Sequence, residues 1–388
     1  MENHLKNYRR RFRIWCNDRR LELEAKRYAA AFADRILSIP DEEAIYSAVR
    51  KQFPHLIPKP KGQLNILAVY HHYNWEDTAL KPALERFGSV HHYDWMTSFR
   101  KGLTQWNRSM REDMNKDLLK KAGEIATSKG IDVIFAYLSG EQVSPDTMRS
   151  LQSFGAPLIN LALNDKENFI GKIRSGQAMG ARDICRFFTL NWTSTEDAVK
   201  KYCVEGAMPI YMPEGANPDI HRPLPLEKTI DVSFIGQRYG NREETIIKLQ
   251  KAGIKVEAFG AGWPNGPLST TAMVDMYSKS RINLGFGGVI GHSGAFCLKG
   301  RDFEVPMSGG LYLTEYHPEL EKVYNIGKEI VTYRNFDDLL TAISNLLNDP
   351  DKADEIRRRG FERARRDHTW EMRFEKIFRI LGLIPWQR

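Results

Sequence analysis

Short apolar runs of strand length alternate with amphipathic segments through most of the chain. Residues 64–70 (LNILAVY) and 131–137 (IDVIFAY) are apolar at nearly every position, which is typical of strands buried on both faces of a parallel sheet. The segments between such runs carry apolar residues at helical spacing. Strands that alternate with helices predict an α/β fold with a parallel, doubly wound sheet, whose ligands bind at the carboxyl ends of the strands.

The predicted elements fall into two groups. In the first half we expect strands at 64–70, 90–93, 131–137, 157–163, 184–190 and 208–211, with helices at 78–87, 118–129, 145–154 and 195–204. In the second half we expect strands at 230–235, 254–259, 282–285, 311–314 and 329–332, with helices at 243–252, 271–278, from 302 onward, and at 337–348, 351–366 and 370–381.

Two proline-rich segments divide the chain. Residues 53–62 contain prolines at 54, 58 and 60 and read as a linker after a helical arm, and residues 211–226 have no period. We therefore predict an N-terminal arm and linker at 1–62, a Rossmann-like domain at 63–222 and a second at 223–388. The arm is an addition that caps the first domain or mediates oligomerisation.

Composition is that of a soluble globular protein of more than one domain. The chain has 388 residues, of which 42% are hydrophobic and 27% charged. No apolar run reaches the ~18 residues that span a bilayer. The N-terminus lacks a signal-peptide core, and the scattered cysteines (Cys16, Cys185, Cys203 and Cys297) form no CxxC pair. We expect a reducing, cytoplasmic setting.

The net charge of +8 favours an acidic partner. The densest basic clusters, at 9–13 and 357–366, also carry apolar residues or acids at helical spacing. They are interpreted as solvated helix faces or, alternatively, as a patch that docks an acceptor or the anionic inner face of a membrane. No strand interleaves aromatic and basic residues, so no nucleic-acid partner is expected.

Residues 282–320 combine features that suit a nucleotide sugar. An apolar strand is followed by a glycine-rich loop, then by Lys299 and Arg301, and then by a helix that opens on Asp302 and carries Glu304. Free backbone N–H groups, a helix dipole and two cations suit phosphate oxygens. A carboxylate one turn into the helix suits ribose or sugar hydroxyls. For Asp302 the alternative is a carboxylate placed for the helix dipole.

A second glycine turn lies upstream. Gly236 follows the strand at 230–235 and precedes Arg238 and Arg242, which we expect to neutralise a leaving diphosphate. The turn is not a GxGxxG fingerprint, which disfavours a dinucleotide. Trp263 follows the next strand, where its ring borders a nucleotide base or packs in the core.

The stretch KGRDFEVPMSGGLYLT at 299–314, together with Phe234-Ile235-Gly236, resembles the donor-binding motif of GT-B glycosyltransferases, in particular the CgeB-like (spore-maturation-protein-like) group. The resemblance covers roughly 231–381. It implies a GT-B fold with two Rossmann-like domains facing a central cleft, beside the extra N-terminal helical arm, with the last helix crossing back onto the first domain. It adds Ser308 and Gly309 to the donor-binding residues.

The resemblance also implies a role for Glu304, which matches the later glutamate of a pair that contacts the donor in many retaining enzymes. Phe296 stands where the earlier glutamate is expected, so the sugar contact and the stereochemical course stay open. Enzymes of this group generally need no divalent metal. We accordingly expect no cofactor beyond a nucleotide-diphospho-sugar of the UDP, dTDP or GDP type.

A general base for the acceptor hydroxyl is expected at strand ends in the first domain. His72 is the first candidate, followed by His71 and Asp77, all directly after the strand at 64–70. Asp165, after the strand at 157–163, is another. For both aspartates a helix N-cap is the alternative.

These features predict a metal-independent glycosyltransferase of polysaccharide biosynthesis, which transfers a sugar to a glycan, lipid-linked or protein acceptor. An oxidoreductase would show GxGxxG after residues 64–70, where His-His-Tyr-Asn stands instead. The remaining alternative is a non-catalytic glycan-binding or coat-associated protein with a degenerate GT-B fold.

Overall fold

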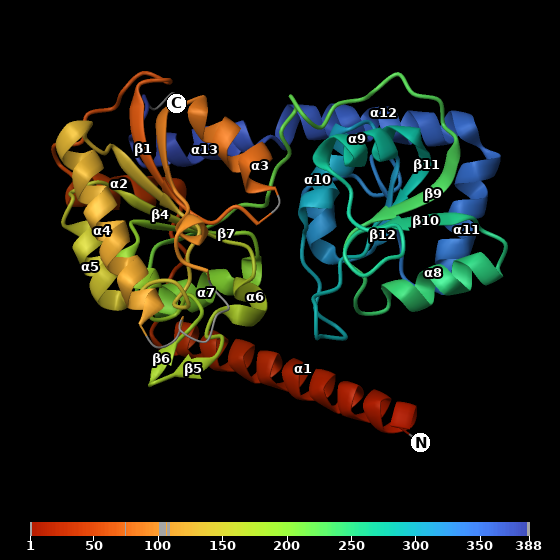
Figure 1. The fold of residues 1–388 in the computed structure, drawn as a ribbon, viewed down its shortest axis with the longest axis horizontal. Coiled ribbons are helices and arrows are strands. Elements are labelled where there is room, and N and C mark those ends of the chain that lie inside the picture. Colours follow the sequence, from red (N-terminus) through yellow and green to blue (C-terminus); the bar gives the residue numbers. More distant parts are fainter. Residues whose placement is uncertain (1, 74, 101–105, 107–108, 386–388) are drawn as a thin grey trace. The chain divides into compact units, whose positions relative to one another are not determined.

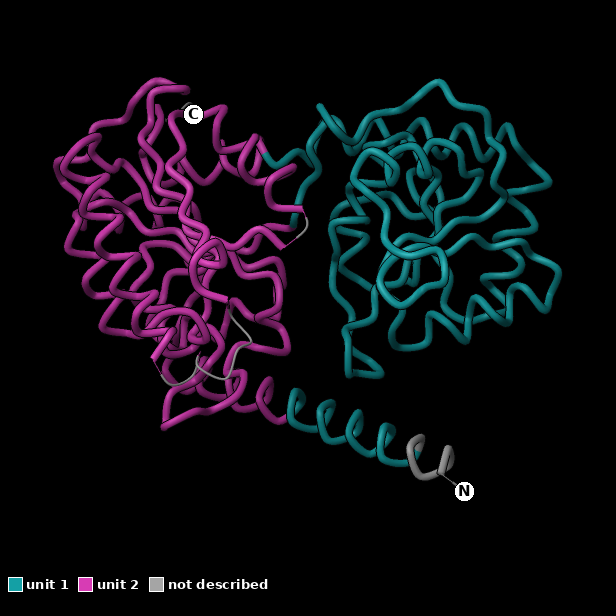
Figure 2. Tube along the Cα trace, viewed as in Figure 1, with its two compact units in different colours: residues 1–22, 214–370 teal, residues 23–213, 371–388 magenta. Residues whose placement is uncertain are grey.

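The computed structural model describes residues 2–73, 75–100, 106 and 109–385. By their contacts they form two compact units, one made of 23–213 with 371–388 and the other of 1–22 with 214–370 (Figure 2). Helix α1 (Glu2–Asp34) contributes to both units. None of the described helices is long and apolar enough to cross a membrane.

The first unit is built on a six-stranded parallel sheet with the order β2-β1-β3-β4-β7-β8 (Figure 1). Its strands are β1 (Leu64–Val69), β2 (Gly88–Tyr93), β3 (Val133–Ala136), β4 (Leu158–Ala162), β7 (Leu190–Thr193) and β8 (Pro209–Tyr211). Its helices include α2 (Glu42–Gln52), α3 (Glu76–Glu85), α4 (Met110–Ser128), α5 (Pro145–Gln152), α6 (Asp165–Asn168), α7 (Glu196–Val204) and α13 (Trp370–Ile380).

Both faces of this sheet are buried, because alternate strand residues pack against different helices. Leu67 of β1 and Ile134 of β3 belong to a core shared with α4 and α5. On the other face, Phe374 of α13 makes edge-on ring contacts with Phe135 (5.1 Å) and Trp192 (5.5 Å). The last helix thus packs with the first sheet, although it follows the second one in sequence.

The second unit contains a five-stranded parallel sheet with the order β10-β9-β11-β12-β13. Its elements are β9 (Ile230–Ile235), α8 (Arg242–Lys251), β10 (Val256–Phe259), α9 (Thr270–Lys279), β11 (Ser280–Leu284), α10 (Gly300–Met307), β12 (Tyr312–Glu315), β13 (Val331–Tyr333), α11 (Phe336–Asn348) and α12 (Pro350–Asp367). One face packs on α8, α11 and α12, and the other on α9 and α10.

In each sheet the strand order reverses at one place. The chain passes from β2 over β1 to β3 in the first unit, and from β10 over β9 to β11 in the second. A crevice forms at such a switch point, beyond the carboxyl ends of the strands. The loops after β1 and after β9 therefore occupy the expected ligand positions in their own units, and both carry predicted site residues. The fold class is confirmed as two Rossmann-like α/β domains with an added N-terminal helix.

Two sequence predictions of local structure were wrong or incomplete. The predicted strand at 184–190 is a turn of 3₁₀ helix, Cys185–Phe187, and β7 starts only at Leu190. The Cys185 N–H donates to the Ala181 carbonyl (2.8 Å), so this buried apolar segment coils before it enters the sheet. The hairpin of β5 (Ile173–Arg174) and β6 (Gln177–Ala178) was not predicted.

Candidate active site

The turn after β9 is built around Gly236 and brings two other elements close to the backbone. The Gly236 N–H donates to the Phe259 carbonyl (2.9 Å), and the Trp263 indole N–H donates to the Gly236 carbonyl (2.8 Å). A Cβ added at Gly236 would lie only 2.7 Å from Nη1 of Arg301. The missing side chain at Gly236 thus makes room for the guanidinium of Arg301.

Arg301 supplies the clearest sign of a ligand. It is the second residue of α10, and its guanidinium lies 5.5 Å from the centre of the Phe234 ring. Its Nε and Nη2 atoms are buried, and neither has a hydrogen-bond partner among the described residues. Burial lowers the pKa of Arg301, but the nearby Tyr312, Tyr277 and Asp302 raise it by more. The pKa therefore lies above its usual value, and the side chain stays charged. Buried donors of a charged group without partners indicate that an anion binds there.

The start of α10 concentrates positive charge next to Arg301. The Lys299 backbone N–H donates to Asp302 Oδ2 (2.7 Å), and the Tyr312 hydroxyl donates to Asp302 Oδ1 (2.6 Å). Asp302 therefore caps the helix and is held by the sheet, as in the alternative interpretation. The Lys299 ammonium lies 3.1 Å from Cys297 Sγ. Lys299 is the N-cap residue of α10 and Arg301 its second residue, so both cations belong to the amino end of this helix.

Two carboxyl groups flank Gly300, the first residue of the same helix. A Cβ built there would lie 3.1 Å from Glu304 Oε1 and 3.7 Å from Glu214 Oε2. Burial raises the pKa of Glu304 to about 7, against the opposing effect of Arg301. Burial and the charge of Glu304 raise the pKa of Glu214 to about 8. Glu214 was not predicted. The only sequence signal for it was its position as a glutamate within the proline-rich segment at 211–226.

The two arginines after Gly236 differ in their surroundings. Arg242 is buried at the start of α8, where it donates to the Gln237 carbonyl (2.8 Å) and the Tyr239 hydroxyl (2.7 Å). Burial and the nearby charge of Arg301 lower its pKa to about 10. Arg238 is ion-paired with Glu243 at the surface and donates to the Gly262 carbonyl (3.1 Å). Arg242 is therefore a buried part of the site, while Arg238 stabilises the turn that follows β9.

The remaining predicted donor residues hold the turn at Gly236 or lie at the carboxyl end of α10. Trp263 packs edge-on against Phe234 at 6.0 Å, and its N–H holds Gly236, which places it in the core of the turn. Ser308 ends α10, and its buried hydroxyl has no partner among the described residues. A Cβ at Gly309 would lie 2.9 Å from Pro223 Cγ. At ~1.5 Å per helical residue, Ser308 and Gly309 are roughly 12 Å along the axis from the amino end of α10.

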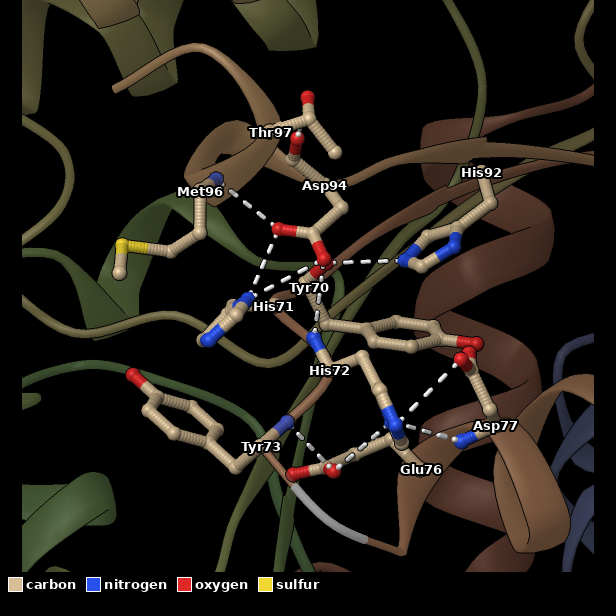
Figure 3. A network of polar contacts seen from close by, with 10 residues as sticks. All are labelled: Tyr70, His71, His72, Tyr73, Glu76, Asp77, His92, Asp94, Met96 and Thr97. Carbon is tan, nitrogen blue, oxygen red and sulfur yellow. Dashed lines mark hydrogen bonds and ion pairs between the residues drawn. The ribbon is translucent and has the colours of Figure 1, made fainter. Parts of the chain in front are cut away.

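In the first unit, His71 is paired with Asp94 (Figure 3). His71 follows β1 and Asp94 follows β2, so the two meet because these strands are parallel neighbours. His71 Nδ1 lies 2.9 and 3.1 Å from the two oxygens of Asp94, which also accepts from the His72 N–H (3.2 Å) and the Met96 N–H (2.9 Å). The contact favours the tautomer that carries its proton on Nδ1, which leaves Nε2 able to accept one. Asp94 was not predicted.

His72 is engaged in the first turn of α3. Its Nδ1 accepts from the Asp77 N–H (3.3 Å), and its Nε2 lies 3.5 Å from Asp77 Oδ2 (Figure 3). The buried Glu76 accepts from the backbone N–H groups of Tyr73 (2.9 Å) and Trp75 (3.1 Å). Trp75 is the N-cap residue of α3, so the alternative role of Asp77 as N-cap was wrong. His72 and Asp77 contact each other and stabilise the start of α3.

Asp165 lies in the wall of a separate cavity of about 510 Å³ within the first unit. The Thr195 hydroxyl (3.1 Å) and the Tyr202 hydroxyl (2.8 Å) donate to its oxygens. Burial raises the pKa of Asp165 to about 6. The cavity is also lined by the aromatic residues Tyr73, Trp75 and Tyr137. Aromatic rings beside polar groups suit a ring-shaped, hydroxylated ligand.

Comparisons with known proteins identify the architecture. Residues 242–379 match the family model described as glycosyl transferase-like. The sucrose-phosphate synthase of Thermosynechococcus elongatus superimposes with a TM-score of 0.60 at 11% identity, over 82% of this chain and 99% of that one. The chain has the GT-B fold. No curated protein sequence matches it significantly.

Two further solved structures share the GT-B fold. A glycosyltransferase from Rickettsia africae has a TM-score of 0.56 at 12% identity and covers 82% of this chain and 99% of its own. HepE from Anabaena, solved in complex with UDP and glucose, has a TM-score of 0.54 at 8% identity, over 81% of this chain and 99% of its own. The described residues contain no group of three or more His, Cys, Asp or Glu side chains placed to hold a metal ion.

Proposed function

We propose that this GT-B protein is a glycosyltransferase that takes a sugar from a nucleotide-diphospho-sugar and transfers it to a hydroxyl-bearing acceptor. The observation that carries the proposal is the pair of buried guanidinium N–H groups of Arg301, which have no partner among the described residues. The same guanidinium lies beside Gly236 through its Nη1 atom, and Arg301 is the second residue of α10. The match of residues 242–379 to the glycosyl transferase-like model supports the same function.

The proposed donor site holds the diphosphate by charge and by backbone donors. Arg301 presents a planar pair of N–H groups to phosphate oxygens, and Lys299 adds a second cation. The first N–H groups of α10 and its dipole favour the same anion. As the bond between the sugar and the phosphate breaks, negative charge grows on the leaving diphosphate, and these groups stabilise it. The proposal therefore needs no divalent metal.

The proposed sugar and ribose contacts come from the two carboxyl groups beside Gly300. Glu304 is assigned to the ribose, as the resemblance implies. The sequence has Phe296 in place of the earlier glutamate of the motif. Glu214 supplies a second carboxyl group close to Gly300 instead. Raised pKa values of about 7 and 8 allow either group to donate as well as accept a hydrogen bond at neutral pH.

We assign the general base to His71 and not to His72. Asp94 fixes the proton of His71 on Nδ1, so that Nε2 can take the proton of the acceptor hydroxyl. The acceptor oxygen then forms its bond to the anomeric carbon, and the diphosphate leaves with the electron pair of the broken bond. In His72 both ring nitrogens already lie against Asp77.

The finer details remain predictions. A UDP sugar is the first donor to test, because HepE was solved with UDP and glucose. Membership in the CgeB-like group, a cytoplasmic setting at the inner membrane face, oligomerisation through α1, and a glycan, lipid-linked or protein acceptor follow from the sequence alone. So do the domain boundaries at 62/63 and 222/223.

The experiment that tests the function measures the release of nucleoside diphosphate from a panel of UDP, dTDP and GDP sugars. We expect one donor to be consumed, slowly with water and faster with added oligosaccharide acceptors. His71→Ala should strongly lower turnover and leave donor binding intact. Binding of a nucleoside diphosphate without turnover of any donor or acceptor would favour the non-catalytic alternative.

A further inference from the structure

The amino-terminal half of α1 exposes three aromatic rings on one face. Tyr8, Phe12 and Trp15 follow the helical spacing i, i+4, i+7 and are 73%, 57% and 61% exposed. The rings of Phe12 and Trp15 are stacked at 5.9 Å. Large aromatic side chains gathered on an exposed helix face are typical of a binding surface.

A different face of the same helix is anchored to the second unit. The Arg10 guanidinium donates to the Gly240 carbonyl (2.8 Å), and the Asn17 amide donates to the Gly291 carbonyl (3.0 Å). Asp18 pairs with His292 at 2.8 Å and accepts from the Ser293 hydroxyl. Leu21 packs against an apolar cluster in the loop after β11. These contacts hold α1 as one wall of a groove.

The groove has a volume of about 1610 Å³ and is formed within the unit of 1–22 and 214–370. Tyr8, Phe12 and Trp15 line it on α1, Ile247 lines it on α8, and Phe286 lines it after β11. We call it the arm groove. It also reaches Arg242, whose pKa is lowered in part by the charge of Arg301, so the groove leads toward the proposed donor site.

The charges in the arm groove leave a positive excess. Three glutamates line it, but Glu243 is paired with Arg238, Glu244 with Lys248 (2.8 Å), and Glu315 accepts from Asn241 (3.2 Å). Arg11 and Lys251 also line it, and neither forms an ion pair among the side chains that the structure describes. The long basic cluster on α12 differs, because Arg358, Arg359 and Arg366 are paired with neighbouring acids.

We propose that the arm groove binds an extended, negatively charged glycan, which is the acceptor chain if the proposed transferase function holds. The flat C–H faces of sugar rings pack on aromatic rings, and carboxylate, sulfate or phosphate groups along the chain pair with Arg11 and Lys251. A groove of this volume accommodates several sugar rings. A flat lipid bilayer would meet only the exposed rings of α1, whereas the groove is also lined by residues of α8 such as Ile247.

Isothermal titration of the full chain with three octasaccharides tests the proposal. The probes are a heparin-derived chain, a hyaluronan chain and the neutral maltooctaose. We expect the two anionic chains to bind, more weakly at high salt, and to lose about tenfold or more in affinity in the Phe12→Ala/Trp15→Ala double variant and in Arg11→Ala. Maltooctaose should bind more weakly than either.

Matched controls separate the groove from general effects. Ile57→Ala removes an exposed apolar residue and Arg365→Ala an exposed arginine, both outside the groove, and neither should change the affinity. Equal binding by the arm variants, or no binding of the anionic chains to wild type, would overturn the proposal. So would binding of the arm to phosphatidylglycerol vesicles with no binding of the octasaccharides.

The test also distinguishes this proposal from the proposed function. The arm variants should keep the thermal stabilisation that a nucleoside diphosphate gives to wild type. Nucleotide stabilisation without octasaccharide binding would overturn the arm groove alone. Octasaccharide binding that depends on Phe12 and Trp15, without stabilisation by any nucleotide, would support the groove and contradict the transferase.

Discussion

The guanidinium of Arg301 lies against the backbone of Gly236, so close that a Cβ at Gly236 would be 2.7 Å from Nη1. Gly236 directly follows β9 and Arg301 is the second residue of α10, so the contact joins the two predicted phosphate-binding segments across 65 positions of sequence. The position of the Arg301 guanidinium therefore depends on the absence of a side chain at Gly236. A substitution at Gly236 should thus affect ligand binding by Arg301.

Gly236→Ala should weaken the binding of nucleoside diphosphates by roughly tenfold or more. The added methyl also meets Phe234 Cζ at 2.9 Å, so the guanidinium must move away from its present position. The affinity can be measured by isothermal titration with the diphosphate that binds wild type best. Gly294→Ala is the matched control, because a Cβ there meets nothing within 4 Å. Unchanged affinity in Gly236→Ala would show that the anion does not bind at this contact.

Glu214→Gln should make the protein more stable at alkaline pH. The pKa of Glu214 is raised to about 8, so the folded state binds a proton that the unfolded state has already released above about pH 5. The associated stability is present at low pH and is lost as pH rises toward 8. The free energy of unfolding, obtained from thermal unfolding between pH 5 and pH 9, should decrease less in the variant than in wild type. The difference should reach roughly 1–3 kcal/mol at pH 9.

The exposed Glu227 offers a control for that measurement, since Glu227→Gln removes the same charge from the surface. It should leave the pH dependence unchanged. An identical decline in wild type and Glu214→Gln would mean that Glu214 is not the group that loses its proton.

His71→Ala should lower the turnover number by about 10²-fold or more, the usual effect of losing a general base. His72→Ala should reduce it by less than about tenfold, because His72 is bound within the first turn of α3 and acts only on local structure. Initial rates with a fixed donor and acceptor provide the measurement. A larger loss in His72→Ala would return the base to the residue favoured by the sequence.

Asp94→Asn should lower turnover while donor affinity stays the same. An amide in place of the carboxylate no longer selects the His71 tautomer with its proton on Nδ1, so Nε2 is a poorer acceptor. Turnover and nucleotide affinity must be measured together, with circular dichroism as the check of folding, because Asp94 also caps the turn at Trp95–Thr97. Equal loss in both quantities would indicate a structural role alone.

Most of the fold could be predicted from the sequence, because buried parallel strands such as β1 and β3 are apolar at nearly every position. The predicted strand at 184–190 was wrong because a short apolar run does not distinguish a strand from a buried turn. The division of α1 between the two units was not predicted either, since its contacts with Gly240 and His292 join residues more than 200 positions apart.

The candidate site was predicted in part. Arg301, Lys299 and Gly236 were found because glycines and cations next to strand ends are local signals. Asp94 and Glu214 were missed because each becomes significant only through a partner distant in sequence, His71 and Glu304 respectively. The choice between His71 and His72 likewise depends on which ring faces Asp94, and adjacent histidines give no sequence signal for that.

A thermal-shift comparison of wild type, Arg301→Ala and Arg365→Ala with UDP, GDP, dTDP, CMP and NAD tests whether Arg301 binds the diphosphate. A ligand that binds only the folded state stabilises it by about 2.7 kcal/mol at one hundred times its dissociation constant. We predict that one nucleoside diphosphate stabilises wild type and Arg365→Ala, and that Arg301→Ala loses most of this effect. Stabilisation by NAD alone, or by no nucleotide at millimolar concentration, would contradict the account.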